Sequence, residues 1–193
     1  MMRIISGSAR GRRLSVPRSG TRPTADRVRE SVFSAVESRL GTFGGLRVAD
    51  LYAGSGAVGL ESLSRGAARA LFVERDRGAL EVLRANIAAV GLPGGVVVDD
   101  DVTRMASTAP SPSASGPYDL VFADPPYELE SAVLEEVLAG LGEHGWLAEG
   151  ALVLIERSRR RDGVTWPDGF DPDRDRTYGE TVVRSAIWYG RTP

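Results

Sequence analysis

The sequence predicts an α/β fold in which a mostly parallel sheet carries helices on both faces. Short apolar runs of strand length alternate along the chain with longer amphipathic segments of helical period. A glycine-rich turn follows the apolar run at 46–49, at a position where parallel sheets bind nucleotide-like ligands. The 193 residues are enough for one substantial core and too few for two full domains with linkers. We therefore expect one domain over 21–193, with a basic β-hairpin arm over 1–20.

The glycine-rich turn has the spacing G-x-G-x-x-G at Gly54, Gly56 and Gly59. This spacing is typical of a tight turn that lets a ligand approach the backbone at a helix N-terminus. It suits NAD, FAD, S-adenosylmethionine or a purely structural turn. Asp50 favours S-adenosylmethionine, because a carboxylate at the strand end would repel a pyrophosphate but suit the cationic amino and sulfonium groups. No Lys-Ser/Thr pair follows the glycines, which argues against a Walker phosphate loop.

Acidic residues follow the next two apolar runs as well. Glu74 comes 20 residues after Gly54, the distance at which a carboxylate at a strand tip reaches ribose hydroxyls. The three aspartates at 99–101 make a poor metal cage, because neighbours in an extended chain point to opposite sides. Asp101 is better placed to accept a hydrogen bond from an adenine amine, with Val102 packing nearby.

The most specific motif is Asp124-Pro125-Pro126-Tyr127, which directly follows the apolar run at 118–123. The two prolines stiffen the loop. An exocyclic amine of a nucleobase is a poor nucleophile, because its lone pair is delocalised into the ring. If Asp124 and the Pro125 carbonyl each accept one N–H, the nitrogen becomes pyramidal and its lone pair can point at a methyl sulfonium. Tyr127 offers a ring on which the base can stack, and Asp124 or water takes the surplus proton. A plain Pro-Pro turn capped by an aspartate is the structural alternative.

The charge is unevenly spread along the chain. Residues 1–30 hold eight arginines against Asp26 and Glu30, a net charge of +6, which leaves −8 for the rest of a chain whose total is −2. A basic arm on an acidic body predicts an anionic partner such as nucleic acid. All 24 basic residues are arginine, as a GC-rich genome would favour, but codon bias does not confine the excess to one end.

The composition also disfavours several classes of chemistry. The chain has no cysteine and a single histidine, His144, so zinc sites, disulfides, thiol nucleophiles and Ser-His-Asp catalysis are disfavoured, and we expect no metal. It has no apolar run of about 18 residues and no apolar N-terminal signal segment. We therefore expect a cytoplasmic protein with no membrane partner.

The remaining segments complete the predicted fold. Residues 3–17 predict a hairpin too small for its own core, which must pack on the main body or on a partner. Thr24 is a candidate N-cap for a helix whose apolar face is formed by Val28, Val32, Phe33, Val36 and Leu40. The later expectations are a loop over 107–117, a helix over 129–141, strands over 152–156 and 181–189, and a solvated or RNA-contacting loop over 157–161. No role is assigned to 157–176 as a whole.

Two sets of motifs resemble known proteins. The spaced set Asp50, Gly54, Gly56, Glu74 and Asp124-Pro125-Pro126-Tyr127 resembles the class I S-adenosylmethionine-dependent methyltransferases that act on exocyclic amines. More narrowly, the following stretches resemble the bacterial 16S ribosomal RNA guanine-N2 methyltransferase family, over nearly the whole chain: Arg3-Ile4-Ile5-x-Gly7, Gly11-Arg12-Arg13-Leu14, Arg22-Pro23-Thr24-x-Asp26-Arg27-Val28-Arg29-Glu30 and Tyr178-Gly179.

The resemblance implies a Rossmann-like class I methyltransferase fold with a seven-stranded, mostly parallel sheet and helices on both faces, plus the N-terminal hairpin. It implies methyl transfer to N2 of one guanine in the head of the small subunit, with 16S rRNA in a subunit or assembly intermediate as the partner of a monomeric enzyme. A stacked target base would have to be flipped out, at a cost of a few kcal/mol, so either base flipping or an already exposed guanine is implied. The expected catalytic residues are Asp124, Pro125, Pro126 and Tyr127. The expected cofactor-binding residues are Asp50, Tyr52, Ala53, Gly54, Ser55, Gly56, Glu74, Arg75, Asp101, Val102 and Asp124. The expected RNA-binding residues are Arg10, Arg12, Arg13, Arg22, Thr24, Arg27 and Arg29.

Three alternatives remain open at this point. The same chemistry could act on adenine N6 or on DNA, since the Asp-Pro-Pro-Tyr arrangement serves several amines. An NAD-dependent oxidoreductase would bind NADH and not S-adenosylmethionine. A non-catalytic RNA-binding module would use the basic arm and bind no cofactor.

Overall fold

A computed structural model describes residues 2–17, 26–160 and 163–190, with side chains in the second range from residue 28 onward. Its strands are β1 (Met2–Arg3), β2 (Arg13–Leu14), β3 (Arg47–Leu51), β4 (Arg69–Glu74), β5 (Gly95–Asp99), β6 (Tyr118–Ala123), β7 (Leu147–Ser158), β8 (Phe170–Tyr178) and β9 (Thr181–Trp188). Its helices are α1 (Asp26–Leu40), α2 (Ala57–Ser64), α3 (Arg77–Val90), α4 (Val102–Ala106) and α5 (Ser131–Glu143). Within these described ranges, no helix has the length and apolar character to cross a membrane.

Strands β3 to β9 of the described chain form one sheet in the order β5-β4-β3-β6-β7-β9-β8, and β1 pairs with β2 separately. The first five strands in this order run parallel to their neighbours, whereas β9 is antiparallel to both β7 and β8. In this register Leu51 lies beside both Val73 and Ala123. The carboxyl ends of β3, β4 and β6 therefore meet at one edge, where doubly wound sheets bind their ligands.

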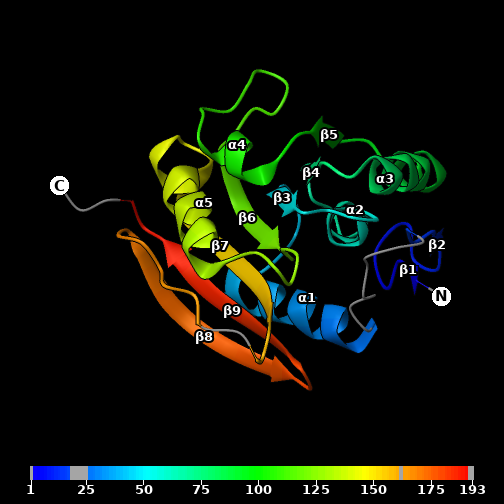
Figure 1. Ribbon diagram of the computed structural model, residues 1–193. Coiled ribbons are helices and arrows are strands. Elements are labelled where there is room, and N and C mark those ends of the chain that lie inside the picture. Colours follow the sequence, from blue (N-terminus) through cyan, green and yellow to red (C-terminus); the bar gives the residue numbers. More distant parts are fainter. Residues whose placement is uncertain (1, 18–25, 161–162, 191–193) are drawn as a thin grey trace.

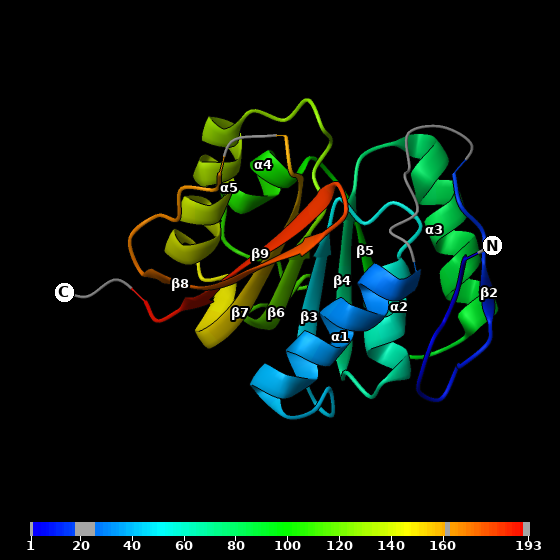
Figure 2. The same ribbon diagram turned by 90° about the horizontal axis from the view of Figure 1, so that it is seen from below.

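The helices cover both faces of the sheet, which confirms the predicted layers (Figure 1). Alternate residues of a strand point to opposite faces, so each strand serves two cores. On β6, Leu120 and Phe122 pack with the apolar stripe of α1, and Val121 packs with α4 and α5. Helices α2 and α3 share the α1 face, where they bury Phe72 of β4. Figure 2 looks onto this face, with α1 crossing in front of the sheet.

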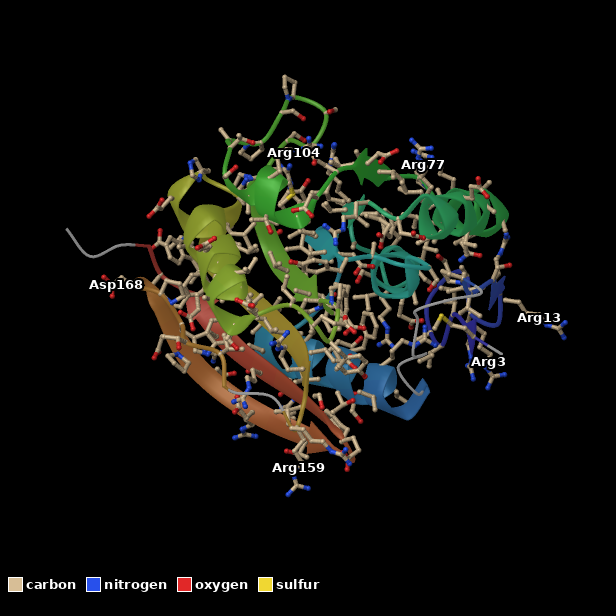
Figure 3. The ribbon with its side chains drawn as sticks, in the orientation of Figure 1. Arg3, Arg13, Arg77, Arg104, Arg159 and Asp168 are labelled. Carbon is tan, nitrogen blue, oxygen red and sulfur yellow. The ribbon has the colours of Figure 1, made fainter. Side chains whose placement is uncertain are left out.

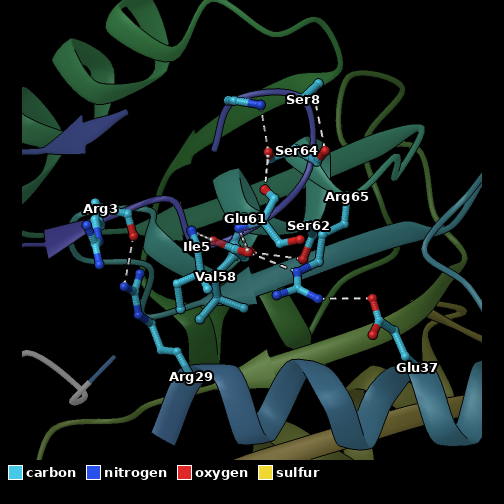
Figure 4. Close-up of polar contacts among 12 residues, drawn as sticks. Arg3, Ile5, Ser8, Arg29, Glu37, Val58, Glu61, Ser62, Ser64 and Arg65 are labelled. Carbon is cyan, nitrogen blue, oxygen red and sulfur yellow. Dashed lines mark hydrogen bonds and ion pairs between the residues drawn. The ribbon is translucent and has the colours of Figure 1, made fainter. Parts of the chain in front are cut away.

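The N-terminal arm is docked on α2 through buried polar groups (Figure 4), and its apolar residues pack with those of α2 and α3. The Glu61 carboxylate, fully buried in α2, accepts the N–H groups of Ile5 at 2.6 Å and Ser6 at 2.9 Å. The Ser64 hydroxyl accepts the Ala9 N–H at 2.9 Å and donates to the Ser6 carbonyl at 2.6 Å. The backbone N–H groups of Ile5, Ser6 and Ala9 are thus satisfied by the main body, as suits a hairpin without a core of its own.

The sequence interpretation missed one strand and shortened another. Strand β8 begins within the segment 157–176 and ends at Tyr178, and the alternating Asp and Arg residues around Pro172 resemble a solvated loop. These residues are exposed because β8 is the edge strand, and an edge tolerates both charge and proline. Strand β7 extends beyond the predicted 152–156 at both ends, so Arg157 belongs to the strand.

Replacing Glu61 by Ala is expected to lower the free energy of unfolding by roughly 2–4 kcal/mol, because two buried N–H groups lose their acceptor. Urea denaturation measures the loss, and limited proteolysis should show the arm becoming accessible. The matched control is Glu81→Ala, since Glu81 is exposed on α3 and its replacement should cost under about 0.5 kcal/mol. Equal stability of the two variants would show that the arm contact contributes nothing.

Candidate functional site

Four carboxylates gather where the parallel strands end. Asp50 and Glu74 lie at the ends of β3 and β4, Asp101 follows β5, and Asp124 follows β6. The negative charge of Glu74 acts on Asp50, and that of Asp50 acts on Asp124, so these three groups share one electrostatic environment. The edge of the sheet therefore carries a local excess of negative charge, which suits a cationic ligand.

The glycine loop between β3 and α2 has a backbone conformation and a close packing that residues with side chains could not adopt. Gly54 and Gly56 have φ values of 54° and 77°, in the left-handed region. A Cβ on Gly56 would lie 2.4 Å from Leu83, and one on Gly59 would lie 2.3 Å from the Phe72 ring. The first two glycines thus allow the turn at the start of α2, and Gly59 allows the helix to pack closely on β4.

Glu74 holds this loop against β4. One carboxylate oxygen accepts the Gly54 N–H at 2.9 Å, and the other accepts the N–H groups of Arg75 and Asp76 at 2.8 Å each. A carboxylate offers about four lone pairs, so acceptor capacity remains beyond these three bonds. The side chain is held in place by these bonds and can still accept a hydrogen bond from a hydroxyl group, as ribose binding requires.

Asp50 lies beneath the loop and is almost fully buried, with 3% of its surface exposed. It accepts the Gly59 N–H at 2.9 Å. Burial raises its pKa to about 7, helped by the charge of Glu74 and opposed by the Gly59 hydrogen bond. Asp50 therefore acts on a ligand in the loop through its charge, and a cation there would favour its ionised form.

Asp101 is committed to contacts within the protein. One oxygen caps α4 by accepting the Thr103 N–H at 2.8 Å, and the other pairs with Arg75 at 2.6 Å. Partial burial raises its pKa, but the hydrogen bonds from the α4 backbone and from Arg75 outweigh burial and lower the pKa below its usual value. An open cleft lies between these groups and Arg104, which Figure 3 shows pointing outward. To accept an adenine amine, Asp101 would have to share its carboxylate with Arg75.

Asp124 stands at the mouth of a second cleft. Its own surface is open to solvent, while the following Pro125 is buried and Tyr127 is 47% exposed. Protein atoms crowd the carboxylate and displace part of its hydration, which raises its pKa, and the charges of Glu156 and Asp50 raise it further. The loop thus presents a carboxylate that readily holds a proton beside an exposed aromatic ring.

Glu156 and Arg157 belong to this cleft, although the sequence interpretation gave them no role in it. They lie beside Asp124 because β7 runs parallel to β6 and ends at the same edge. Arg157 is 5% exposed and donates to the Leu129 carbonyl at 2.9 Å, which anchors the loop that follows Tyr127. The prediction that Arg157 begins a solvated or RNA-contacting loop is therefore wrong. Glu156 already lay in the predicted strand over 152–156, and a longer predicted strand would have added Arg157.

Tyr52 stands between the two clefts. It is strained, with a φ of 58°, and its buried hydroxyl has no hydrogen-bond partner among the residues that the structure describes. Burial raises its pKa to about 12, and the charge of Asp101 raises it too, while Arg75 and Arg157 act in the opposite direction. A buried hydroxyl without a partner and a strained backbone are features of ligand sites.

Asn86 of α3 ties the arm to the glycine loop. Its side-chain amide donates to the carbonyls of Ser15 at 2.9 Å and Ser55 at 2.8 Å, and its oxygen accepts the Ser15 N–H at 2.9 Å. The residue is 2% exposed, so these bonds form away from water. One buried side chain therefore connects the position of the arm to that of the glycine loop.

The predicted RNA-binding arginines occupy different environments. Arg10 and Arg13 are exposed, and Figure 3 shows Arg13 and Arg3 pointing away from the body. Arg12 is exposed but donates to the Ala89 carbonyl at 2.6 Å. Arg29 is 2% exposed and donates to the Arg3 carbonyl at 3.0 Å, so it helps to dock the arm and does not lie on the surface. Predictions for Arg22, Thr24 and the Arg27 side chain fall outside the described residues.

Comparison with known proteins gives consistent matches over the whole chain. Residues 2–187 match the family model described as conserved hypothetical protein 95. Ribosomal RNA small subunit methyltransferase D of Escherichia coli K12 is 36% identical over 184 residues, covering 95% of this chain and 88% of that protein. The Haemophilus influenzae protein of the same name is 32% identical, covering 95% of this chain and 92% of its own.

Solved structures agree with the sequence matches. An Escherichia coli protein described as "Putative methyltransferase yhhF" superposes with a TM-score of 0.85 at 34% identity, covering 98% of this chain and 99% of that one. An RNA methyltransferase from Salinibacter ruber, solved in complex with S-adenosyl-L-homocysteine, gives a TM-score of 0.62 at 18% identity, covering 89% of this chain and 97% of that one. The second match is a likeness of fold.

Replacing Asp50 by Asn is expected to reduce the pH dependence of stability of the ligand-free protein between about pH 5 and pH 8. Because the folded-state pKa of about 7 lies above the ordinary value, the folded protein binds the extra proton in this range. The free energy of unfolding should therefore fall as the pH rises through 7, by roughly 2–3 kcal/mol from this group. Asn can still accept the Gly59 N–H, and it carries no charge to desolvate.

Urea denaturation of both proteins at several pH values measures this difference. The variant should be the more stable protein at pH 8 and should approach wild type at pH 5. The same pH profile in wild type and variant would mean that Asp50 is ionised throughout.

Proposed function

We propose a function from one premise: the chain belongs to the conserved hypothetical protein 95 family, the family of ribosomal RNA small subunit methyltransferase D. The protein transfers a methyl group from S-adenosylmethionine to the exocyclic N2 amine of a guanine in 16S ribosomal RNA. Its fold is that of the class I methyltransferases. The observation that carries the proposal is the placement of the glycine loop and the Asp124 loop at the tips of two adjacent parallel strands, β3 and β6.

The residues at the edge of the sheet fit S-adenosylmethionine. The cluster of carboxylates around Asp50 suits a ligand that carries a sulfonium and an amino group, whereas it would repel the pyrophosphate of NAD. Glu74 retains acceptor capacity for ribose, and Tyr52 has a buried hydroxyl that lacks a partner among the described residues. When bound, the cofactor supplies an electrophilic methyl group.

The remaining cofactor contacts follow from the same geometry. We place the ligand against the backbone from Tyr52 to Gly56, whose turn depends on the positive φ of Gly54 and Gly56. At Gly56 the missing side chain makes room for Leu83 of α3. Asp101 and Val102 flank the adenine side, provided that Arg75 shares the Asp101 carboxylate. These assignments are proposals from position and hydrogen-bonding capacity.

The catalytic loop positions the amine. Asp124 and the Pro125 carbonyl accept the two N–H groups, so the nitrogen lone pair is directed toward the methyl carbon. Asp124 takes the proton that leaves the nitrogen, a role for which its raised pKa suits it. Tyr127, half exposed at the cleft mouth, offers its ring to the flipped base. Arg157 anchors this loop through the Leu129 carbonyl.

The exposed arginines of the arm, Arg10 and Arg13, are the proposed RNA contacts among the described residues. In this proposal the arm, residues 1–20, contacts RNA, and the domain over residues 21–193 binds the cofactor and catalyses methyl transfer. We further propose that the enzyme works as a cytoplasmic monomer on 16S rRNA within a small subunit or an assembly intermediate. Methylation assays that compare undermethylated subunits with naked rRNA distinguish these substrates.

The methylated nucleoside identifies the acceptor. Transfer of labelled methyl groups to undermethylated small subunits, followed by nucleoside analysis, is expected to give N2-methylguanosine. Label in N6-methyladenosine would instead support the adenine alternative, and label in DNA would support a DNA methyltransferase. Binding of NADH without binding of S-adenosylmethionine would favour an oxidoreductase.

Replacing Asp124 by Ala is expected to lower the rate of methyl transfer by about 100-fold or more. The amine then loses both the hydrogen-bond acceptor that orients it and the group that takes its proton. Binding of S-adenosylmethionine, measured by calorimetry, should change little. Glu128→Ala is the matched control, since Glu128 is an exposed carboxylate in the same loop. Full activity of the Asp124 variant would remove this residue from the mechanism.

A further inference from the structure

A groove lies beside α1, on the face of the sheet that α1 covers and toward the β7–β9–β8 end. Its volume is about 220 Å³. The walls are contributed by α1 and by the three strands at the antiparallel end of the sheet, β7, β9 and β8. Figure 2 shows these strands curving away next to α1, on the face toward the viewer. No step of the proposed mechanism uses this groove.

Strand register connects the groove to the catalytic cleft. Glu156, which acts on Asp124, pairs with Val183, and Val183 pairs with Arg176 of β8. Paired residues project to the same face of a sheet, so this row crosses from the catalytic cleft into the groove. Three strand spacings separate Asp124 on β6 from Arg176 on β8, a distance of roughly 14 Å. At the strand tips, Thr181 lines the cleft and its partner Tyr178 lines the groove.

The charged groups of the groove are mostly arginines. Arg39 from the last turn of α1 and Arg174 and Arg176 from β8 face a single carboxylate in its lining, that of Asp173. Two of these arginines, Arg39 and Arg174, are exposed. This local excess of positive charge stands on a chain whose net charge is −2, so it does not follow from the overall composition.

The floor of the groove is apolar. Val32 of α1 and Leu154 and Val183 of the sheet form it, and Tyr178 closes the end nearest the cleft. An apolar floor with an aromatic ring at one end and guanidinium groups along the rim matches a single nucleic acid strand. Bases pack on the apolar and aromatic surface, and arginines contact the phosphates.

We propose that this groove binds the RNA strand that flanks the target base, with Arg39, Arg174 and Arg176 contacting its phosphates. The inference rests on the proposed function, and it adds a second RNA surface on the side of the catalytic loop opposite the N-terminal arm. With the arm on one side and the groove on the other, the target nucleotide is held between two anchored segments. Such anchoring supplies binding free energy for holding the base out of its stack.

The test replaces Arg39, Arg174 and Arg176 by Ala, singly and together, and measures RNA binding over a series of salt concentrations. Each lost phosphate contact is expected to reduce the slope of log affinity against log salt by roughly 0.7. The triple variant should raise the KM for RNA by about tenfold or more while kcat, S-adenosylmethionine affinity and the urea midpoint stay close to wild type. Asp173→Asn should act in the opposite direction and strengthen binding.

The matched control is Arg84→Ala, because Arg84 is an exposed arginine on α3, at the other end of the sheet. It should leave the salt slope and the KM for RNA unchanged. A triple variant with the wild-type slope and KM would overturn the proposal. Loss of binding to assembled subunits without loss of binding to naked rRNA would overturn it too, because the groove would then contact a ribosomal protein.

The experiment distinguishes failure of the groove proposal from failure of the proposed function. If the wild-type enzyme methylates rRNA and the groove variants match it, the groove proposal alone fails. If the wild-type enzyme methylates no RNA, the proposed function fails, and the salt series still decides whether the groove binds RNA.

Discussion

The parallel pairing of β3 with β6 is the constraint on which the site depends. In this register Asp50 lies beside Phe122 and Leu51 beside Ala123, so the loops that leave the two strands start at the same level. One loop carries the glycines and the other carries Asp124. Because these segments are about 70 residues apart in the chain, no local interaction could bring them together. Hydrogen bonding between two central strands does so, and the helices on both faces keep the strands fixed.

Crowded carboxylates at this edge work against the stability of the ligand-free protein. Burial raises the pKa of Asp50 to about 7, and Asp124 is shifted upward as well. Because folding removes water from around both carboxylates, each favours the folded state less when it is ionised than when it is protonated. A cationic ligand would relieve the same repulsion, so the structural cost and the proposed cofactor preference have one electrostatic origin.

Hydrogen bonds connect the docked arm to the glycine loop, and so connect the proposed RNA contacts to the proposed cofactor site. Glu61 and Ser64 hold the arm on α2, and Asn86 joins Ser15 of the arm to Ser55 of the glycine loop. A ligand that orders one of these segments reduces the conformational freedom that the other has to lose. The arm therefore supports the proposed cofactor site, in addition to its proposed role in contacting RNA.

The sequence by itself determined the order of most elements, though not α4 or β8, and the identity of the motifs. Hydrophobic period, glycine spacing and the Asp-Pro-Pro-Tyr stretch are local properties. It also predicted the α1 helix and the arm's need for a packing surface. The tertiary structure decided which side chains share an environment. Arg29, predicted to meet RNA, is buried under the arm. Glu156 and Arg157 lie near Asp124 because β7 runs parallel to β6 and ends at the same edge. Strand β8 could not be recognised from the sequence. An edge strand makes few apolar contacts, and the exposed Asp and Arg residues of β8 show no alternation of apolar with polar residues. Local patterns encode local conformation, whereas burial and charge coupling depend on which distant segments the sheet places side by side.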